Sequence, residues 1–305
     1  MIDRRNFLTL AASVAMAAQA RSSKAKTKVE WPIAIFEKVF EGLTYVELAK
    51  ALEEIGADGV EATIRPGGHI DPAVATAEIP KMQQALGDRG KRIIIAATHI
   101  RSVHEPATKP LLEAIVANGI THYRMGHYHY DLKKPLKPQL DRFAEQAAEL
   151  AELNQELGIQ GLYQNHSGSS SYKRGYVGAL GWDAAFMLDK VDPDGLGMAM
   201  DTRHLRKDTG ASWRVALQAC KPHIRSIYVK DGVWKGERGD EYEDVPLDTG
   251  FVNKQLFTEI RAGLDPMPLC IHMEWLGYRV FKKHEIPKAI QAHVRDITTL
   301  NSWMH

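Results

Sequence analysis

Two carboxylates in this chain follow short apolar runs that are typical of buried strands. The run Leu196–Met200 ends in Asp201, with His204 three residues later, and the run Leu269–Met273 ends in Glu274. Carboxylates and imidazoles bind Mn²⁺, Zn²⁺, Co²⁺ or Mg²⁺, and they also transfer protons. A buried carboxylate needs compensation, which a metal ion or a substrate offers. Asp201 alone is a weak signal, because an Asp after a strand is more often a helix cap or a turn former.

Polar side chains also follow the other apolar runs. Candidates at or near strand ends are Glu37, Glu61, His69, His99, Arg124, His127, Gln164, Asn165, His166, Lys230 and Asp231. Of the thirteen histidines, seven lie at or near a strand end: His69, His99, His127, His129, His166, His204 and His272. Random placement would put more of them on helices. Such a set can support proton transfer next to a sugar carbonyl or hydroxyl, with a divalent ion polarising oxygen.

Several candidates have a simpler structural explanation. Glu61 could be an interior ion-pair partner, Asp231 a loop cap, and His272 a satisfied core histidine. His127 and His129, between tyrosines, are more typical of a loop surface than of ligands.

These residues are positioned by alternating strand and helix patterns. The expected strands are Trp31–Phe36, Gly59–Ile64, Arg92–Thr98, His122–Met125, Gln160–Tyr163, Gly195–Met200, Ile224–Val229 and Leu269–Met273. The expected helices are Leu43–Ile55, Glu78–Gly87, Lys109–Ala117, Pro138–Leu157, Trp182–Lys190, Ser212–Cys220, Asn253–Ala262 and Ile286–Leu300, with a polar insertion or long loop at Trp234–Val245. Eight such units predict an α/β fold, a single (β/α)8 TIM barrel over residues 28–305, with its active site at the carboxyl ends of the strands.

The first residues of the chain differ from the rest. Arg4 and Arg5 precede a short apolar run that leads to Ala18-Gln-Ala20, which predicts a twin-arginine signal peptide and linker over residues 1–27. An ordinary Sec signal is the alternative. We expect a periplasmic or secreted protein with no membrane association after signal removal. The formal net charge of +1 gives no global attraction to nucleic acid, and two cysteines, Cys220 and Cys270, form no disulfide framework.

The chain resembles the sugar phosphate isomerase/epimerase superfamily, the xylose isomerase-like TIM barrels. The resemblance rests on the order of Gly56-Ala-Asp-Gly-Val-Glu61, Tyr163-Gln-Asn-His166, Asp201-Thr-Arg-His204, Val229-Lys-Asp231, Val245-Pro-Leu-Asp-Thr-Gly250 and Glu274. It implies one divalent ion, held by Glu, Asp, His and Glu on strands five to eight. Here Asp201 and Glu274 match, whereas Gln164 and Tyr228 replace the Glu and the His.

This departure leaves the implied metal short of donors. The resemblance then implies a set of Gln164, Asp201, His204 and Glu274 for Mn, Zn, Co or Mg, with His166 or His272 as alternatives to His204, or a branch with changed metal dependence. With these two replacements and the motifs Arg65-Pro-Gly-Gly-His69 and Tyr123-Arg-Met-Gly126, the chain resembles an exported branch of the superfamily that has keto-glycoside lyase relatives.

We therefore expect a metal-dependent isomerase or epimerase that abstracts a proton next to a carbonyl of a non-phosphorylated sugar or keto-sugar. The expected catalytic residues are His166, Lys230 and Glu61, and the expected substrate-binding residues are His69, Arg124, Asn165 and His204. The alternatives are a 3-keto-glycoside lyase or hydratase, a periplasmic sugar-binding barrel without catalysis, and, least favoured, a nuclease of the endonuclease-IV type. The expected partner is a sugar or glycoside, with no nucleic acid, and homo-oligomerisation is left open.

Overall fold

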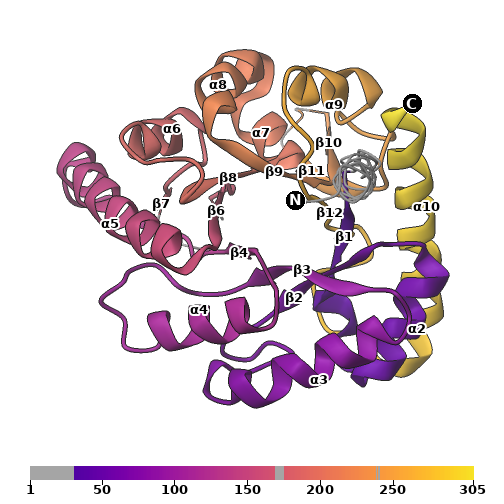
Figure 1. Ribbon diagram of the computed structural model, residues 1–305. Helices are drawn as coiled ribbons and strands as arrows, with labels where there is room; N and C mark the ends of the chain where they lie inside the picture. The colour runs from indigo at the N-terminus through magenta and orange to yellow at the C-terminus, as the bar shows by residue number, and fades with distance from the viewer. Residues whose placement is uncertain (1–30, 169–174, 238, 240) are drawn as a thin grey trace, which may run out of the picture. The chain divides into compact units, whose positions relative to one another are not determined.

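The computed structural model describes residues 31–168, 175–237, 239 and 241–305. Eight parallel strands close a barrel in the order β1-β12-β9-β8-β6-β4-β3-β2, and helices surround it (Figure 1). The barrel strands are β1 (Ile33–Phe36), β2 (Gly59–Thr63), β3 (Arg92–Ala97), β4 (His122–Arg124), β6 (Gln160–Gln164), β8 (Leu196–Asp201), β9 (Ile224–Val229) and β12 (Leu269–Ile271). The predicted fold is confirmed.

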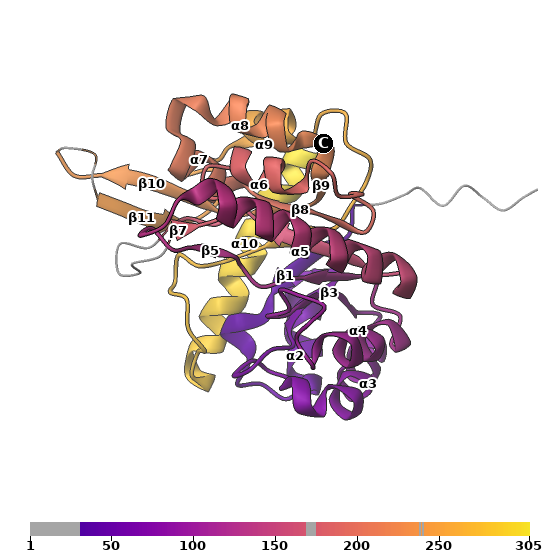
Figure 2. The same ribbon diagram turned by 90° about the vertical axis from the view of Figure 1, so that its left-hand side faces the viewer.

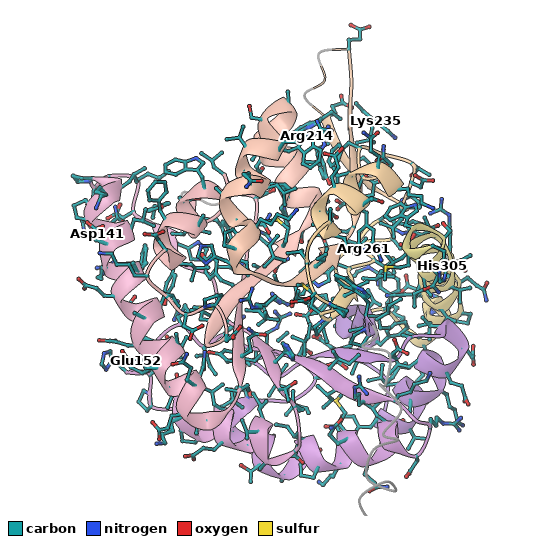
Figure 3. The ribbon with its side chains drawn as sticks, turned by 45° about the horizontal axis from the view of Figure 1, so that its top comes forward. Asp141, Glu152, Arg214, Lys235, Arg261 and His305 are labelled. Carbon is teal, nitrogen blue, oxygen red and sulfur yellow. The ribbon has the colours of Figure 1, made fainter. Side chains whose placement is uncertain are left out.

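Helices follow the strands along the chain and cover the outside of the barrel. They are α2 (Tyr45–Ile55), α3 (Ala75–Gly87), α4 (Thr108–Ala117), α5 (Leu136–Leu157), α6 (Trp182–Leu188), α7 (Thr202–Thr209), α8 (Trp213–Cys220), α9 (Lys254–Arg261) and α10 (Ile286–Met304). Their outer faces carry charged side chains, such as Asp141 and Glu152 on α5 (Figure 3). No helix among the described residues is long and apolar enough to cross a membrane.

Local sequence accounts for the element boundaries. At the start of α2, Thr44 and Glu47 form a capping box, and the helix ends at Gly56, whose φ of 81° suits glycine. A cluster of buried residues from β1, β3, β6, β8, β9 and β12 contains the small side chains Ala34, Ala97 and Ala199. Small residues leave room for the polar side chains that end the strands.

Three local features go beyond the predicted strands and helices. Of the two alternatives for Trp234–Val245, the structure agrees with an insertion: β10 (Asp231–Lys235) and β11 (Glu241–Val245) pair as an antiparallel hairpin that projects from the barrel (Figure 2). A helix not expected from the sequence, α7, starts directly after β8, because the Asp201 carboxylate accepts the backbone N–H of His204 and caps it. The pair β5 (His129–Tyr130) and β7 (Gly175–Tyr176) was also not expected.

The predicted signal peptide and linker, residues 1–27, lie outside the described residues. Cys220 and Cys270 are both free and buried.

Candidate active site

A cavity of about 390 Å³ opens at the carboxyl ends of the barrel strands. We call it the mouth pocket. Its lining is mostly polar and includes Phe36, Arg65, His99, Arg124, His127, Gln164, His166, Tyr176, Arg203, Lys230, His272, Glu274 and Tyr278. The strand ends place these groups: Arg124 is the last residue of β4, Gln164 is the last of β6, and Lys230 follows β9 directly.

One lysine lies between the two carboxylates that were predicted to hold a metal ion. The ammonium of Lys230 is 3.0 Å from Oδ2 of Asp201 and 3.1 Å from Oε1 of Glu274. The amide nitrogen of Gln164 donates to the same Asp201 oxygen at 2.8 Å. Side-chain exposure is 3% for Lys230, 0% for Asp201 and 12% for Glu274, so these charges interact with little screening by water.

A second cation and an imidazole stand beside this lysine. Arg203 donates to Oε2 of Glu274 at 2.7 Å and pairs with Asp244 of the hairpin. Although burial opposes it, the charges of Lys230 and Arg203 hold the pKa of the Glu274 carboxyl well below its usual value. His204 is buried, with Ser167 at Nδ1 and Arg203 at Nε2, and burial together with Lys230 holds the pKa of its imidazole well below the usual value.

Glu61 lies deeper in the barrel, at a register shift between β2 and β3. It accepts from Arg124 Nε at 2.6 Å, Tyr228 Oη at 2.8 Å and His272 Nε2 at 2.8 Å. Burial alone would raise the pKa of its carboxyl, but the charges of Arg124 and His272 lower it overall. Glu61 is fully buried and both of its oxygens accept hydrogen bonds. It is therefore an interior ion-pair partner of Arg124, which was one of its two interpretations.

His166 presents a different kind of group to the pocket. Its Nδ1 lies 2.9 Å from the carbonyl oxygen of Ser167, which can only accept, so Nδ1 carries the proton and Nε2 keeps its lone pair. Burial and the charge of Lys230 lower the pKa of His166 to about 4, which keeps the ring neutral near pH 7. The rings of His204, His127 and Tyr176 pack around it, at centroid distances of 4.1, 4.9 and 4.8 Å.

Several candidates from the sequence do not line the mouth pocket, among them Glu61, Asp201 and His204, and three others are engaged elsewhere. His69 contacts Glu37 through Nδ1 and the carbonyl of Leu43 through Nε2, both at 3.0 Å. Asn165 bridges β6 and β8 by exchanging hydrogen bonds with the backbone of Asp201. Asp231 accepts backbone N–H groups of Gly232, Thr249, Gly250 and Val252, which makes it the loop cap that was one of its two interpretations.

Other lining residues were not among the predicted site residues. Arg203 lies inside the motif Asp201-Thr-Arg-His204, so its position in that motif was an available signal. Phe36 stacks on His272 at 4.6 Å and lies near Tyr278 at 6.2 Å, and no sequence pattern brings these three rings together. His127 lines the pocket with a buried Nε2 that has no hydrogen-bond partner among the described residues, which corrects its interpretation as loop surface.

The residues present do not fit the implied divalent ion as they are arranged. Among the predicted set, the oxygens of Asp201 and Glu274 are taken by Lys230, Arg203 and Gln164. Glu61, Cys270 and His272 form a possible metal site, since their ligand atoms lie within 4.8 Å of one another. There, however, His272 Nε2 is directed at Glu61, and burial and Glu61 raise the pKa of the Cys270 thiol well above its usual value. A neutral thiol is a poor ligand.

The comparisons with known proteins agree with this architecture. The fold is similar to that of a 3-keto-D-glucoside 4-epimerase from E. coli, with 14% identity, a TM-score of 0.64 and coverage of 90% of this chain and 100% of that one. It is also similar to that of a probable 3-DHS dehydratase from Bacillus anthracis, with 14% identity, a TM-score of 0.64 and coverage of 88% of this chain and 98% of that one. A third similar structure is a xylose isomerase-like barrel from Mycobacterium smegmatis in complex with magnesium. Its identity is 16%, its TM-score is 0.64, and the match covers 90% of this chain and 98% of that one.

The sequence itself gives the family. No curated protein matches it significantly. The model of the xylose isomerase-like TIM barrel family matches residues 49–292, which is more than half of the chain. The chain therefore belongs to the xylose isomerase-like TIM barrel family.

Proposed function

We propose that this protein is an enzyme that removes a proton next to a carbonyl of a non-phosphorylated sugar or keto-sugar, as isomerases and epimerases do. The observation that carries the proposal is that His166, with a free lone pair on Nε2, lines the same pocket as the ammonium of Lys230. A base and a buried cation are the two groups that enolisation requires.

The proposed steps use only these side chains. Nε2 of His166 takes the proton from the carbon, and the electron pair moves to the carbonyl oxygen. Lys230, whose third N–H is not used by Asp201 or Glu274, donates to the oxyanion that forms. Return of a proton to the same carbon from the opposite face gives an epimer. An isomer forms when the proton of the neighbouring hydroxyl moves to the oxyanion and the proton on His166 goes to the former carbonyl carbon. Loss of a leaving group from the adjacent carbon, with its bonding electrons, gives an unsaturated ketone.

The second of these outcomes, a keto-glycoside lyase, is favoured by one residue. Epimerisation moves a proton from one face of a carbon to the other and generally uses a proton-transfer group on each face. Gln164, which stands where the resemblance implies a metal-binding carboxylate, cannot serve as a second proton-transfer group, because an amide does not take up a proton. Elimination needs only one base, so this substitution favours it over epimerisation.

The surroundings support a sugar as the substrate class. The rings of Phe36, Tyr278 and Tyr176 line the pocket beside its many polar side chains, and ring faces combined with placed polar groups suit the binding of a sugar. The similar folds of a 3-keto-glucoside epimerase and a probable dehydratase are consistent with this choice. Export through the twin-arginine signal, and with it a periplasmic or secreted location, is part of the same proposal.

Solvent exchange tests the proposal. The purified chain is incubated in D₂O with free sugars and, separately, with 3-keto-glucosides, and both are followed by NMR. Deuterium uptake at the carbon next to the carbonyl, without release of the aglycone, supports an isomerase or epimerase. Release of the aglycone supports the lyase. No exchange and no release, with binding of the same ligands by calorimetry, would instead support a sugar-binding barrel without catalysis.

A further inference from the structure

The carboxylate oxygens of Asp201 and Glu274 are all engaged by protein groups. One ammonium, Lys230, contacts both carboxylates, at 3.0 and 3.1 Å. The guanidinium of Arg203 contacts the remaining oxygen of Glu274 at 2.7 Å, and the backbone N–H of His204 contacts the remaining oxygen of Asp201 at 3.0 Å. Lys230 contacts both carboxylates and Arg203 bridges Glu274 to Asp244 of the hairpin, so each oxygen of Asp201 and Glu274 already has a partner within the protein.

The two residues that depart from the family pattern also have other partners. Gln164 donates its amide to Asp201 at 2.8 Å, and its carbonyl oxygen accepts from Arg124 at 3.3 Å. The hydroxyl of Tyr228 donates to Glu61 at 2.8 Å. Each replaced ligand is therefore part of an internal hydrogen-bond network, and neither leaves a free donor atom for a cation.

We infer that the Lys230 ammonium takes the place of a divalent metal ion between Asp201 and Glu274, and that this chain works without a metal. A dication between these carboxylates would stand beside two buried positive charges, which repel it. The exclusion of the ion rests only on these contacts. The further role of Lys230, as donor to the substrate oxyanion, rests on the function proposed above.

The side chain of Lys230 suits this role. It is 3% exposed, and it is held in place by the two carboxylates, so it presents a fixed and largely desolvated positive charge at the wall of the pocket. An ammonium has three N–H donors. One donates to Glu274, and Asp201 is an ion-pair partner, which leaves at least one donor for a ligand in the mouth pocket that Lys230 lines.

Metal binding in the absence of substrate tests the replacement. Mn²⁺ is titrated calorimetrically into the chelator-treated chain, and the experiment is repeated with Lys230→Ala and with Lys230→Ala combined with Gln164→Glu. We expect no measurable binding by the unmodified chain. We expect the double variant to bind one Mn²⁺ at least about tenfold more tightly, since it has three carboxylates and no ammonium. Lys221→Ala, on the opposite side of the barrel, is the matched control and should gain nothing.

The outcomes are separable. Stoichiometric Mn²⁺ binding by the unmodified chain, or a divalent ion that copurifies with it, overturns the inference. If circular dichroism shows that the double variant is folded and it still binds no Mn²⁺, these carboxylates do not form an ion site, and the replacement is wrong. Because no substrate is present, a failure of the proposed reaction leaves this result unchanged.

Discussion

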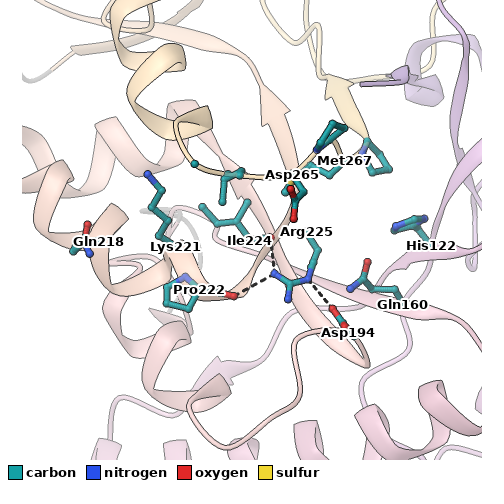
Figure 4. Close-up of a pocket in the computed structure, with 14 residues that line it drawn as sticks. His122, Gln160, Asp194, Gln218, Lys221, Pro222, Ile224, Arg225, Asp265 and Met267 are labelled. Carbon is teal, nitrogen blue, oxygen red and sulfur yellow. Dashed lines mark hydrogen bonds and ion pairs between the residues drawn. The ribbon is translucent and has the colours of Figure 1, made fainter. Parts of the chain in front are cut away.

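Among the described residues a cavity lies at each end of the barrel, and the larger of these two is not the candidate active site. The opposite cavity, of about 790 Å³, is lined by the first residues of strands, including His122, Gln160 and Ile224, together with Asp194, Lys221 and Arg225 (Figure 4). The mouth pocket, at the other ends of the same strands, has about half that volume, 390 Å³. Volume alone would select the other end.

What distinguishes the two cavities is how their charges are held. In the opposite cavity Arg225 pairs with Asp194 at 3.1 Å, but the Asp194 side chain is 80% exposed, so water screens the pair. In the mouth pocket Lys230 is 3% exposed and contacts two carboxylates. Charges are kept in a buried site only where other groups compensate them, and such arrangements are concentrated at functional sites. The comparison shows that buried, paired charge is the better guide here.

The largest expected effect is on turnover. His166→Gln removes the proposed base, and we expect the rate of solvent deuterium exchange to fall by about 10²–10⁴-fold, the usual contribution of a general base. His122→Gln, which changes a histidine of the opposite cavity, should leave the rate unchanged. NMR exchange rates under identical conditions measure both. Equal losses in the two variants would remove the functional distinction between the cavities.

The second expected effect is on stability. Glu61→Gln leaves the buried guanidinium of Arg124 without its carboxylate, and we expect the free energy of unfolding to fall by roughly 3–5 kcal/mol. Asp194→Asn breaks the exposed pair of the opposite cavity and should cost no more than about 1 kcal/mol. Urea unfolding followed by tryptophan fluorescence measures both changes. A small decrease in the free energy of unfolding for Glu61→Gln would mean that Glu61 and Arg124 do not form a desolvated ion pair.

The smallest expected effect is on the pH dependence of stability, and it comes from a histidine that is buried but lies outside both cavities. His293, on α10, is fully buried away from both cavities, and burial lowers the pKa of its ring from 6.5 to about 4. Between these values the unfolded chain binds a proton that the folded chain does not, so this residue makes stability fall as the pH falls from about 6.5 to about 4. The full contribution is on the order of 3 kcal/mol.

His293→Leu should remove that part of the pH dependence and leave deuterium exchange at neutral pH unchanged. The measurement is the difference in the free energy of unfolding between the variant and the unmodified chain at pH 7 and near pH 4.5. A difference that does not change with pH would show that the buried ring is not neutral. A loss of exchange activity in a folded variant would link α10 to the site.

Much of the site could be located from the sequence, because a parallel strand ends where its apolar run ends. Gln164, His166 and Lys230 lie at the predicted strand ends and do line the mouth pocket. His69 and Asn165 also follow strands, yet their side chains are engaged elsewhere, by Glu37 and by the backbone of Asp201. Beyond a strand end, the direction of a side chain depends on the conformation of the loop. The hydrophobic periodicity of the sequence does not predict that conformation.

The sequence by itself determined the barrel, since eight strand and helix patterns are local and depend on burial alone. It also placed the polar residues at one end. Only the tertiary structure decided their partners: Lys230 meets Asp201 and Glu274 because β8, β9 and β12 are neighbours in the closed barrel. Ion pairs between distant segments depend on strand order and side-chain direction together. That is why two carboxylates predicted to bind a metal ion are found around a lysine.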